Sequence, residues 1–310
     1  MTPAVSGVPT FRVAQRDGQQ PTWSKEDGFD LTHPASPTSD PIERAIKLQC
    51  HYTPVMIDPA KTALLIIDFQ NFNVSKALGC DVQAYFDAED LLLRYAIPAA
   101  RSAGIQIVWI TTGYSNEDIE KMDPGPWRTF GWHPELNGLL WGKLQPGDNY
   151  SSDGEFRSQK GIGDPIGSIT LEDSTTVDAG GVMSRGSWNA WLHGRLADAY
   201  EQSKQTEKPD VHFYKNRSSG MCDKMTACTE YLETNNLRTL LFTGLNTDQC
   251  VMGTLQDAYS KGFDTIMLGD GCATNSPEYA QLSCEFNCMR SWGFLSSCKD
   301  LAEAAEQIPK

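Results

Sequence analysis

Continuous hydrophobic runs alternate with amphipathic stretches over most of the chain. ALLIIDF (63–69) and IQIVWITTG (105–113) are unbroken apolar runs, which is typical of strands buried on both faces. Between them, AEDLLLRYAIPAARSAG predicts a helix that ends at Gly104, and Pro98 is expected to kink or split it. This part of the chain therefore predicts a strand, a helix and a second strand.

The same alternation resumes near residue 188 and continues towards the end of the chain. The predicted elements are a helix at 188–203, strand VHFYK (211–215), a helix at 223–236, strand TLLFTG (239–244), a helix after Cys250 that Gly262 closes, strand TIMLGDG (265–271), a helix near 278–291 and a last strand at 293–297. Strands and helices that alternate at this spacing form right-handed βαβ units. We therefore predict an α/β fold with a doubly wound, mainly parallel sheet covered on both faces.

Two regions break this pattern. Residues 1 to about 57 are rich in Pro, Ser, Thr and Asp, which predicts a largely irregular N-terminal arm that wraps the surface or a partner subunit. Residues 115–186 are rich in Gly, Pro and Ser and are too long for a simple connection, so we expect a loop-rich insertion that covers a functional site. The remainder, 58–310, is predicted to be a single domain.

The charge and cysteine content of the chain limit the kinds of molecule it is expected to bind. The formal net charge of −14 argues against nucleic acid or an anionic membrane surface as a partner. No run of 18 or more apolar residues and no signal-peptide pattern is present in the sequence. The chain contains nine cysteines, which we interpret as mostly buried thiols of a reduced, cytoplasmic protein that acts on a small molecule.

Polar residues stand where three of the predicted strands end. Asp68 follows five apolar residues, Lys215 ends VHFYK, and Cys250 follows TGLNTDQ. Thr247 or Asp248 can cap the helix after the fourth strand, which places Cys250 in the first turn, where free N–H groups favour a thiolate. Taken singly, the three are also consistent with a capping carboxylate, a solvent-exposed lysine and a buried structural cysteine.

Together the three residues form a coherent catalytic hypothesis. The carboxyl ends of parallel strands meet at one edge of a sheet, so these side chains are expected to lie close together. A thiol nucleophile needs a base to take its proton, which a carboxylate supplies. It also needs a cation to hold negative charge, which a lysine supplies. We predict a catalytic triad of Asp68, Lys215 and Cys250.

Three segments carry a family resemblance. ALLIIDFQN, FYKNRSSG and TGLNTDQCVMGTLQDAYSKGFDTIMLGDGCAT are similar to the signature regions of the isochorismatase-like cysteine hydrolases. The resemblance runs from about Thr62 to Ala305, apart from the 115–186 insertion. It implies a three-layer α/β/α sandwich with a six-stranded sheet, and a homo-oligomer (dimer or tetramer).

The resemblance also implies roles for individual residues. Asp68 would be the general base, Cys250 the nucleophile and Lys215 the group that stabilises the charged states. Members typically carry a cis peptide four residues before the cysteine, which is Leu245–Asn246 here. The Asn246 and Cys250 N–H groups would then form the oxyanion hole.

Two departures from the family pattern narrow the reaction. Isochorismatases cleave a vinyl ether and usually lack this cysteine, so Cys250 favours hydrolysis of a C–N bond in an amide, carbamoyl or ureido group. The remaining candidates are relatives of N-carbamoylsarcosine, maleamate and ureidoacrylate amidohydrolases. Nicotinamidases bind a metal through histidines after the second strand. Here the corresponding segment, TTGYSNEDIEK (111–121), contains no histidine, and the next one along the chain is His133. We therefore predict no metal and no other cofactor. A vinyl-ether hydrolase that uses Asp68 as its acid, and a non-catalytic binding scaffold, stay open as alternatives.

Candidate substrate contacts lie near the strand ends and in the insertion. The candidates are Asn71, Phe72, Tyr114, Trp127, Arg185 and Trp188. Arg185 could clamp a substrate carboxylate with two hydrogen bonds, although a salt bridge explains it equally well. Plain packing is the alternative for each aromatic residue.

Overall fold

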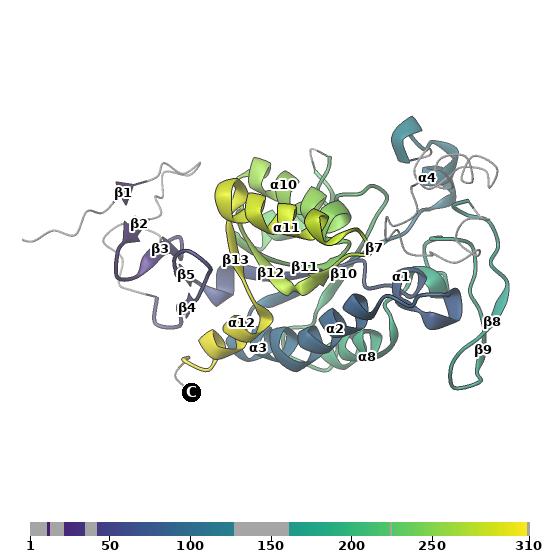
Figure 1. Cartoon of the computed structure of the whole chain (residues 1–310), viewed down its shortest axis with the longest axis horizontal. Helices are drawn as coiled ribbons and strands as arrows, with labels where there is room; N and C mark the ends of the chain where they lie inside the picture. Colours follow the sequence, from purple (N-terminus) through teal and green to yellow (C-terminus); the bar gives the residue numbers. More distant parts are fainter. Residues whose placement is uncertain (1–10, 13–21, 35–41, 127–160, 224, 309–310) are drawn as a thin grey trace, which may run out of the picture.

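The molecule is built around one parallel β-sheet. The computed structural model describes residues 11–12, 22–34, 42–126, 161–223 and 225–308 (Figure 1). The strands are β6 (Thr62–Ile67), β7 (Gln106–Thr112), β10 (Val211–Lys215), β11 (Thr239–Leu245), β12 (Asp264–Ala273) and β13 (Phe294–Ser296). Their order across the sheet is β10-β7-β6-β11-β12-β13, and every neighbouring pair is parallel. The order runs outward in both directions from β6 and β11, so the topological switch point lies between these two strands.

Helices cover both faces of this sheet, which confirms the predicted three-layer α/β/α sandwich (Figure 1). One layer contains α2, α3, α8 and α12, and the other contains α9, α10 and α11. The helices are α2 (Gln83–Leu91), α3 (Ile97–Ala103), α8 (Gly194–Ser203), α9 (Ala227–Thr234), α10 (Met252–Lys261), α11 (Glu278–Asn287) and α12 (Cys298–Ala305). Alternate residues of β6 enter the two cores: Leu64 and Ile66 one, Leu65 and Ile67 the other. This explains the unbroken hydrophobic runs, because a strand covered on both faces has no solvent side.

The helix before β7 is split as its proline predicts. The π-helical turn η3 (Leu92–Ala96) separates α2 from α3, and Pro98 lies in the first turn of α3. Proline has no N–H to donate to the preceding turn, so the regular ladder is interrupted just before it. The helix ends at Gly104, whose φ of 83° suits glycine.

The described part of residues 1–57 is more regular than the sequence indicates. It forms a second sheet of order β1-β2-β3-β5-β4, made of β1 (Phe11–Arg12), β2 (Thr22–Ser24), β3 (Gly28–Leu31), β4 (Ile46–Leu48) and β5 (Val55–Ile57). Strands of two to four residues are too short to show an alternating pattern. The sheet attaches to the β13 edge through His51 N–H to Leu295 O (2.8 Å) and Ser296 Oγ to Gln49 O (2.6 Å). The domain boundary near residue 57 stays a prediction.

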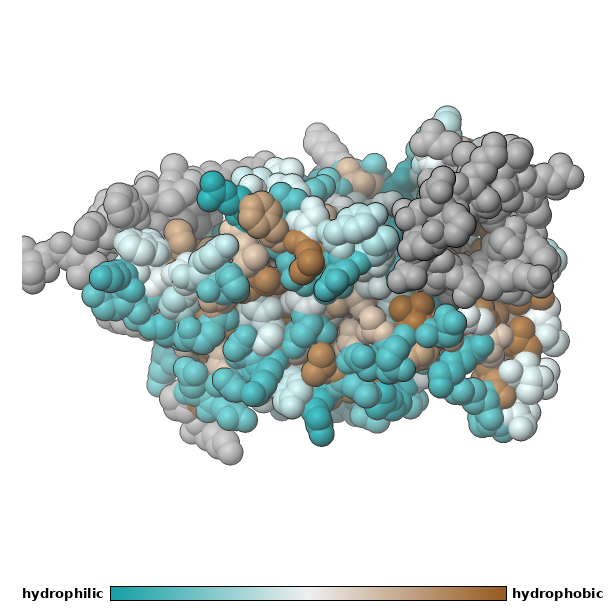
Figure 2. All heavy atoms as spheres, in the orientation of Figure 1, coloured by the Kyte–Doolittle hydropathy of each residue, from teal (hydrophilic) through white to brown (hydrophobic). Residues whose placement is uncertain are grey.

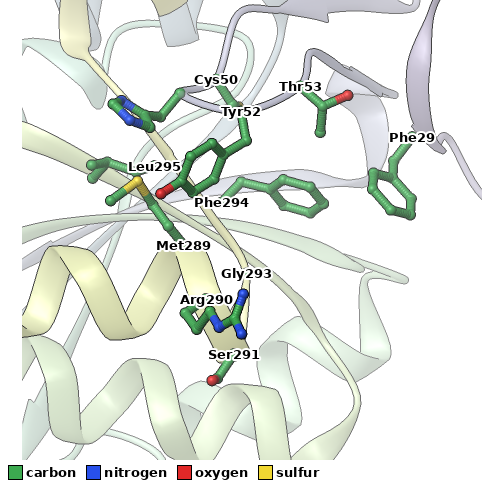
Figure 3. Close-up of a pocket in the computed structure, with 11 residues that line it drawn as sticks. Phe29, Cys50, Tyr52, Thr53, Met289, Arg290, Ser291, Gly293, Phe294 and Leu295 are labelled. Atoms are coloured by element: carbon green, nitrogen blue, oxygen red, sulfur yellow. The ribbon is translucent and has the colours of Figure 1, made fainter. Parts of the chain in front are cut away.

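A pocket of about 290 Å³ lies at this junction. Figure 3 shows rings of Tyr52, Phe294 and Phe29 along it, with Arg290 on the helical side. Because β13 is the edge strand opposite β10, this pocket lies at the far side of the sheet from Lys215.

The outer face of α11 carries exposed hydrophobic side chains. Tyr279, Leu282 and Phe286 are spaced by three and four residues, so they share one face of the helix. Figure 2 shows hydrophobic residues at the surface in the region of α11. The opposite face packs on the sheet through buried Cys284. Among the described residues, no helix is long and apolar enough to cross a membrane.

The predictions for residues 115–203 differ from the structure in detail. The described parts of the insertion contain α4 (Asn116–Glu120) and a hairpin of β8 (Ser168–Thr170) and β9 (Thr176–Asp178). The helix predicted from residue 188 begins at Gly194 instead, after a short 3₁₀ turn, η4 (Trp188–Ala190). Between them Leu192 bridges to Gln70, a pairing that holds this segment extended.

Candidate active site

Asp68 stands at the point where β6 leaves the sheet. Its φ of 56° lies in the left-handed region, which costs a non-glycine residue about 1 kcal/mol or more. Its N–H donates to Ile110 O (2.8 Å), and its carbonyl accepts from Asn73 Nδ2 (2.9 Å). These two bonds hold the backbone in this conformation at the carboxyl end of the sheet.

The Asp68 carboxylate is buried and uses both oxygens. Oδ1 accepts from the Thr112 N–H (2.8 Å) and the Thr112 hydroxyl (3.0 Å). Oδ2 lies 2.8 Å from Lys215 Nζ, and the two side chains are 3% and 4% exposed. A buried ion pair is tolerated when further hydrogen bonds satisfy its charged groups, and Thr112 provides them here.

Lys215 is brought to Asp68 by the register of the sheet. It is the last residue of β10 and pairs with Thr112 at the end of β7. Its Nζ also donates to Thr112 Oγ1 (2.6 Å), Arg217 O (3.1 Å) and Cys250 Sγ (3.3 Å). Burial alone lowers the pKa of Lys215, but the interactions with Asp68 and with Cys250 together outweigh it and raise the pKa above its usual value. Lys215 is therefore an ammonium group.

Cys250 completes the cluster from the π-helical turn η5 (Thr247–Val251), which follows β11. Burial raises the pKa of the Cys250 thiol to about 12; Lys215 lowers it, whereas the charge and hydrogen bond of Asp68 raise it. The resting state is thus a neutral thiol hydrogen-bonded to a carboxylate. This differs from the thiolate that the helix N-terminus predicts, because burial and Asp68 outweigh the free N–H groups.

The predicted helix cap is also different. The residue at the cap position is Asn246, and it makes no side-chain capping bond. Asp248 instead accepts from Thr274 Oγ1 (2.6 Å) and Ser276 Oγ (2.7 Å). Asp248 therefore ties the Cys250 turn to the loop after β12 rather than capping it.

The peptide bond Leu245–Asn246 is cis, as the resemblance implies. Asn246 Oδ1 accepts a hydrogen bond of 2.5 Å from the Tyr85 hydroxyl of α2. Gly244 has a φ of 132°, and a Cβ there would lie 2.2 Å from Ile67 O, so this position requires glycine. The β11 end is thus fixed by contacts with β6 and α2.

Comparison with known proteins agrees with this architecture. The sequence model of the isochorismatase domain family matches residues 172–287. Ureidoacrylate amidohydrolase RutB of Stutzerimonas stutzeri is 26% identical over 280 residues, which cover 87% of this chain and 93% of that protein. RutB of Methylorubrum extorquens is 28% identical over 264 residues, which cover 83% and 88%. The chain is thus similar to the isochorismatase domain family over residues 172–287 and to the RutB amidohydrolases over most of its length.

Solved structures share the fold of this isochorismatase-like chain. Nicotinamidase PncA from Bacillus subtilis superposes with a TM-score of 0.52 at 20% identity, over 76% of this chain and 99% of that one. A cysteine hydrolase from Pseudomonas syringae pv. phaseolicola gives 0.54 at 13% identity, over 88% and 100%. At these identities the likeness concerns the fold alone.

Four of the predicted substrate contacts lie around one hydrophobic cluster. Phe72 and Tyr114 are buried in it with Val182 and Met183, and Trp188 packs against it. The Asn71 side chain donates to Trp188 O (2.8 Å), so it holds the 188–193 segment. Substrate binding by these residues stays a prediction, and Trp127 lies outside the described residues.

Arg185 is engaged within the protein. Its guanidinium pairs with Asp118 (3.1 Å), donates from Nε to Gly113 O (3.1 Å) and lies over the Tyr214 ring, 5.9 Å from its centre. The salt-bridge alternative therefore describes what the structure shows. The side chain is 43% exposed, so the carboxylate clamp stays an untested prediction.

The sequence reasoning missed three residues of this site. Thr112 connects Asp68 to Lys215, and the Gln70 side chain exchanges two hydrogen bonds with the Thr112 backbone (2.7 and 3.1 Å). Tyr85 holds Asn246. The hydroxyl at the end of the second hydrophobic run, ITTG, was a usable signal for Thr112. Tyr85 gave no signal, because its partner is distant in sequence.

The described residues contain no group of three or more His, Cys, Asp or Glu side chains that could hold a metal ion. The prediction that this isochorismatase-like protein uses no metal or cofactor is tested by metal analysis of the purified protein.

Proposed function

We propose that this isochorismatase-like protein is a cysteine hydrolase that cleaves a C–N bond of a small amide, carbamoyl or ureido compound. The observation that carries the proposal is the contact of Lys215 with both Asp68 (2.8 Å) and Cys250 (3.3 Å). A half-buried thiol beside a carboxylate and an ammonium has a base and a counter-ion within contact distance. The RutB relatives, named ureidoacrylate amidohydrolases, support this class of reaction.

The first half of the reaction forms a thioester. Asp68 takes the thiol proton as Cys250 Sγ bonds to the carbonyl carbon, so no free thiolate has to persist in the resting enzyme. The oxyanion accepts from the Asn246 and Cys250 N–H groups. Lys215 keeps the net charge of the cluster balanced while the proton moves. The C–N bond then breaks, and the leaving nitrogen takes the proton from Asp68.

The second half releases the acid. A water molecule gives its proton to Asp68 and bonds to the thioester carbon. The C–S bond breaks, and the proton on Asp68 returns to the sulfur. Both halves use the same carboxylate as base and then as acid, which its position between Thr112 and Lys215 permits.

Loss of the thiol tests the proposal. We expect Cys250→Ala to lower kcat/KM on amide, ureido and carbamoyl substrates by about 10³-fold or more, with an unchanged melting temperature. Cys284→Ala is the matched control, because Cys284 is a buried thiol on α11. Hydrolysis of a C–N substrate that survives in Cys250→Ala would contradict the thiol mechanism and favour an acid role for Asp68 alone.

The assembly and location of the enzyme are further expectations. We expect a cytoplasmic homo-oligomer, and sedimentation of the purified protein measures its subunit number.

A further inference from the structure

The Tyr114 hydroxyl is a buried polar group to which the described residues offer no hydrogen bond. Tyr114 is 2% exposed. Its hydroxyl has no hydrogen-bond partner among the described residues. An unpaired buried hydroxyl costs about 1–3 kcal/mol, and phenylalanine would fill the same space without that cost. Such a group calls for a partner that arrives with a ligand.

The position of Tyr114 connects it to the catalytic cluster. It follows β7, two residues after Thr112, whose hydroxyl contacts both Asp68 and Lys215. Two other buried hydroxyls without a partner among the described residues bracket β11: Thr239 lies where β11 begins, at the opposite end of the sheet, and Thr247 lies in η5, the turn that carries Cys250. Tyr114 thus combines an unpaired hydroxyl with a place at the carboxyl ends of the strands.

The backbone of Tyr114 is held on both sides. Its N–H donates to Met183 O (2.8 Å), and its carbonyl accepts from the Arg185 N–H (2.9 Å). The preceding Gly113 donates to Lys215 O (2.9 Å) and lies under the Tyr214 ring, where a Cβ would come within 2.4 Å. The ring itself packs among Phe72 and its neighbours. The hydroxyl is therefore preorganised on a fixed frame.

The hydroxyl is a neutral donor. Burial raises the pKa of Tyr114 to about 12, while Lys215 lowers it and Asp68 and Cys250 raise it. The phenol therefore keeps its proton over the physiological pH range. It can donate to an oxygen of the substrate.

We propose that Tyr114 is a specificity-determining residue, whose hydroxyl donates to a second oxygen of the substrate, beyond the scissile carbonyl. The preferred class is then an amide or ureido compound with a further carbonyl or carboxylate oxygen, rather than a simple amide or urea. This inference rests on the proposed function. It adds a selection rule that the triad alone does not impose.

Two pairs of compounds test the rule. 3-Ureidopropionate and propylurea share a ureido group but differ in the carboxylate, and maleamate and cis-crotonamide differ in the same way. We expect the wild type to prefer the acid of each pair. Tyr114→Phe should lower kcat/KM for the acid by about 10- to 100-fold and change that of its partner less than about twofold, because one hydrogen bond is lost. For pairs that turn over too slowly, calorimetric binding to Cys250→Ala and to the Cys250→Ala, Tyr114→Phe double variant gives the same ratio.

Tyr214→Phe is the matched control. The Tyr214 hydroxyl accepts from the Gly186 N–H (3.3 Å), so its loss should leave the substrate preference unchanged. Tyr114→Phe should melt at the wild-type temperature or above, since it removes a hydroxyl that has no partner in the described part of the chain.

Three results would overturn the assignment: an unchanged preference in Tyr114→Phe, a clear loss of stability in that variant, or no binding of either acid. The activity of Cys250→Ala distinguishes failure of this assignment from failure of the proposed function. If Cys250→Ala is inactive and Tyr114→Phe keeps the wild-type preference for the acid, only the assignment of Tyr114 fails. If Cys250→Ala is active, the thiol mechanism fails.

Discussion

The two ends of strand β10 each carry an ion pair with a buried carboxylate, and the two pairs differ in their surroundings. At the carboxyl end, Lys215 lies 2.8 Å from Asp68. Just before the amino end, Asp210 lies 2.9 Å from Arg101 of α3. Both join a carboxylate that is almost fully buried to a cation, so burial of charge alone does not separate a structural pair from a catalytic one.

Their surroundings separate them. Asp210 also accepts from Trp109 Nε1 (3.0 Å), and Arg101 also donates to Ala199 O (2.7 Å), so this pair joins α3, β7 and α8. The Lys215 ammonium instead contacts a thiol. We take a reactive group within reach of the pair as the mark of a functional end. On the proposed function this is the carboxyl end of the sheet, where ligands bind in doubly wound folds.

Loss of the ammonium should give the largest effect on activity. Lys215→Met leaves Asp68 without its counter-ion and the sulfur without a nearby positive charge. We expect kcat/KM on a C–N substrate to fall by about 10³-fold or more. Circular dichroism should show that the variant is folded. A loss of less than tenfold would mean that the two pairs of β10 are alike.

The reverse pattern is expected at the other end of the strand. Asp210→Asn removes the charge that Arg101 faces, and we expect a loss of about 2 kcal/mol in the free energy of unfolding. This lies below the usual value for breaking a buried pair, because the Arg101 side chain is 29% exposed. The activity of the folded fraction should stay within about twofold of the wild type. Urea unfolding and steady-state kinetics measure the two quantities, and a selective loss of activity would break the comparison.

The protonation state of Cys250 sharpens the comparison further. With its pKa raised to about 12, the thiol is neutral at pH 7, and the thiolate fraction rises as the pH increases towards that value. Alkylation of Cys250 by iodoacetamide should therefore be slow near neutrality and accelerate about tenfold per pH unit up to about pH 11.

The same reaction should be slower still in Lys215→Met, because Lys215 lowers the pKa of the thiol. Exposed Cys222 provides the internal reference in each digest. A rate for Cys250 that levels off near pH 7 would show a stable thiolate and contradict the neutral resting state.

The central strands were well predicted because β6 and β7 are buried on both faces. VHFYK matches β10 residue for residue, and the runs at 63–69 and 105–113 differ from β6 and β7 by one or two residues. The helix predicted at 223–236 is shorter, because α9 begins after Thr226, whose hydroxyl caps it by accepting from the Thr229 N–H. Element type followed from hydrophobic pattern, whereas boundaries depended on individual caps.

The site was predictable as far as it follows from strand direction. Asp68, Lys215 and Cys250 meet because parallel strands end at one edge. The side-chain partners of Asp248 and Asn246 depend on contacts with residues far along the chain, so no local pattern reveals them. The thiolate expected for Cys250 differs from the raised pKa for the same reason, because the burial of the sulfur depends on how the site packs.

An intact-mass measurement tests the central claim most directly. The protein is mixed with 3-ureidopropionate, maleamate and simple amides, quenched in acid within seconds, and its mass is compared with that of Cys250→Ala treated identically. The predicted result is an added acyl mass that peptide mapping places on Cys250 and that the variant lacks. Turnover of a C–N substrate with no acyl mass under any quench condition, or with the same rate in Cys250→Ala, would contradict the account.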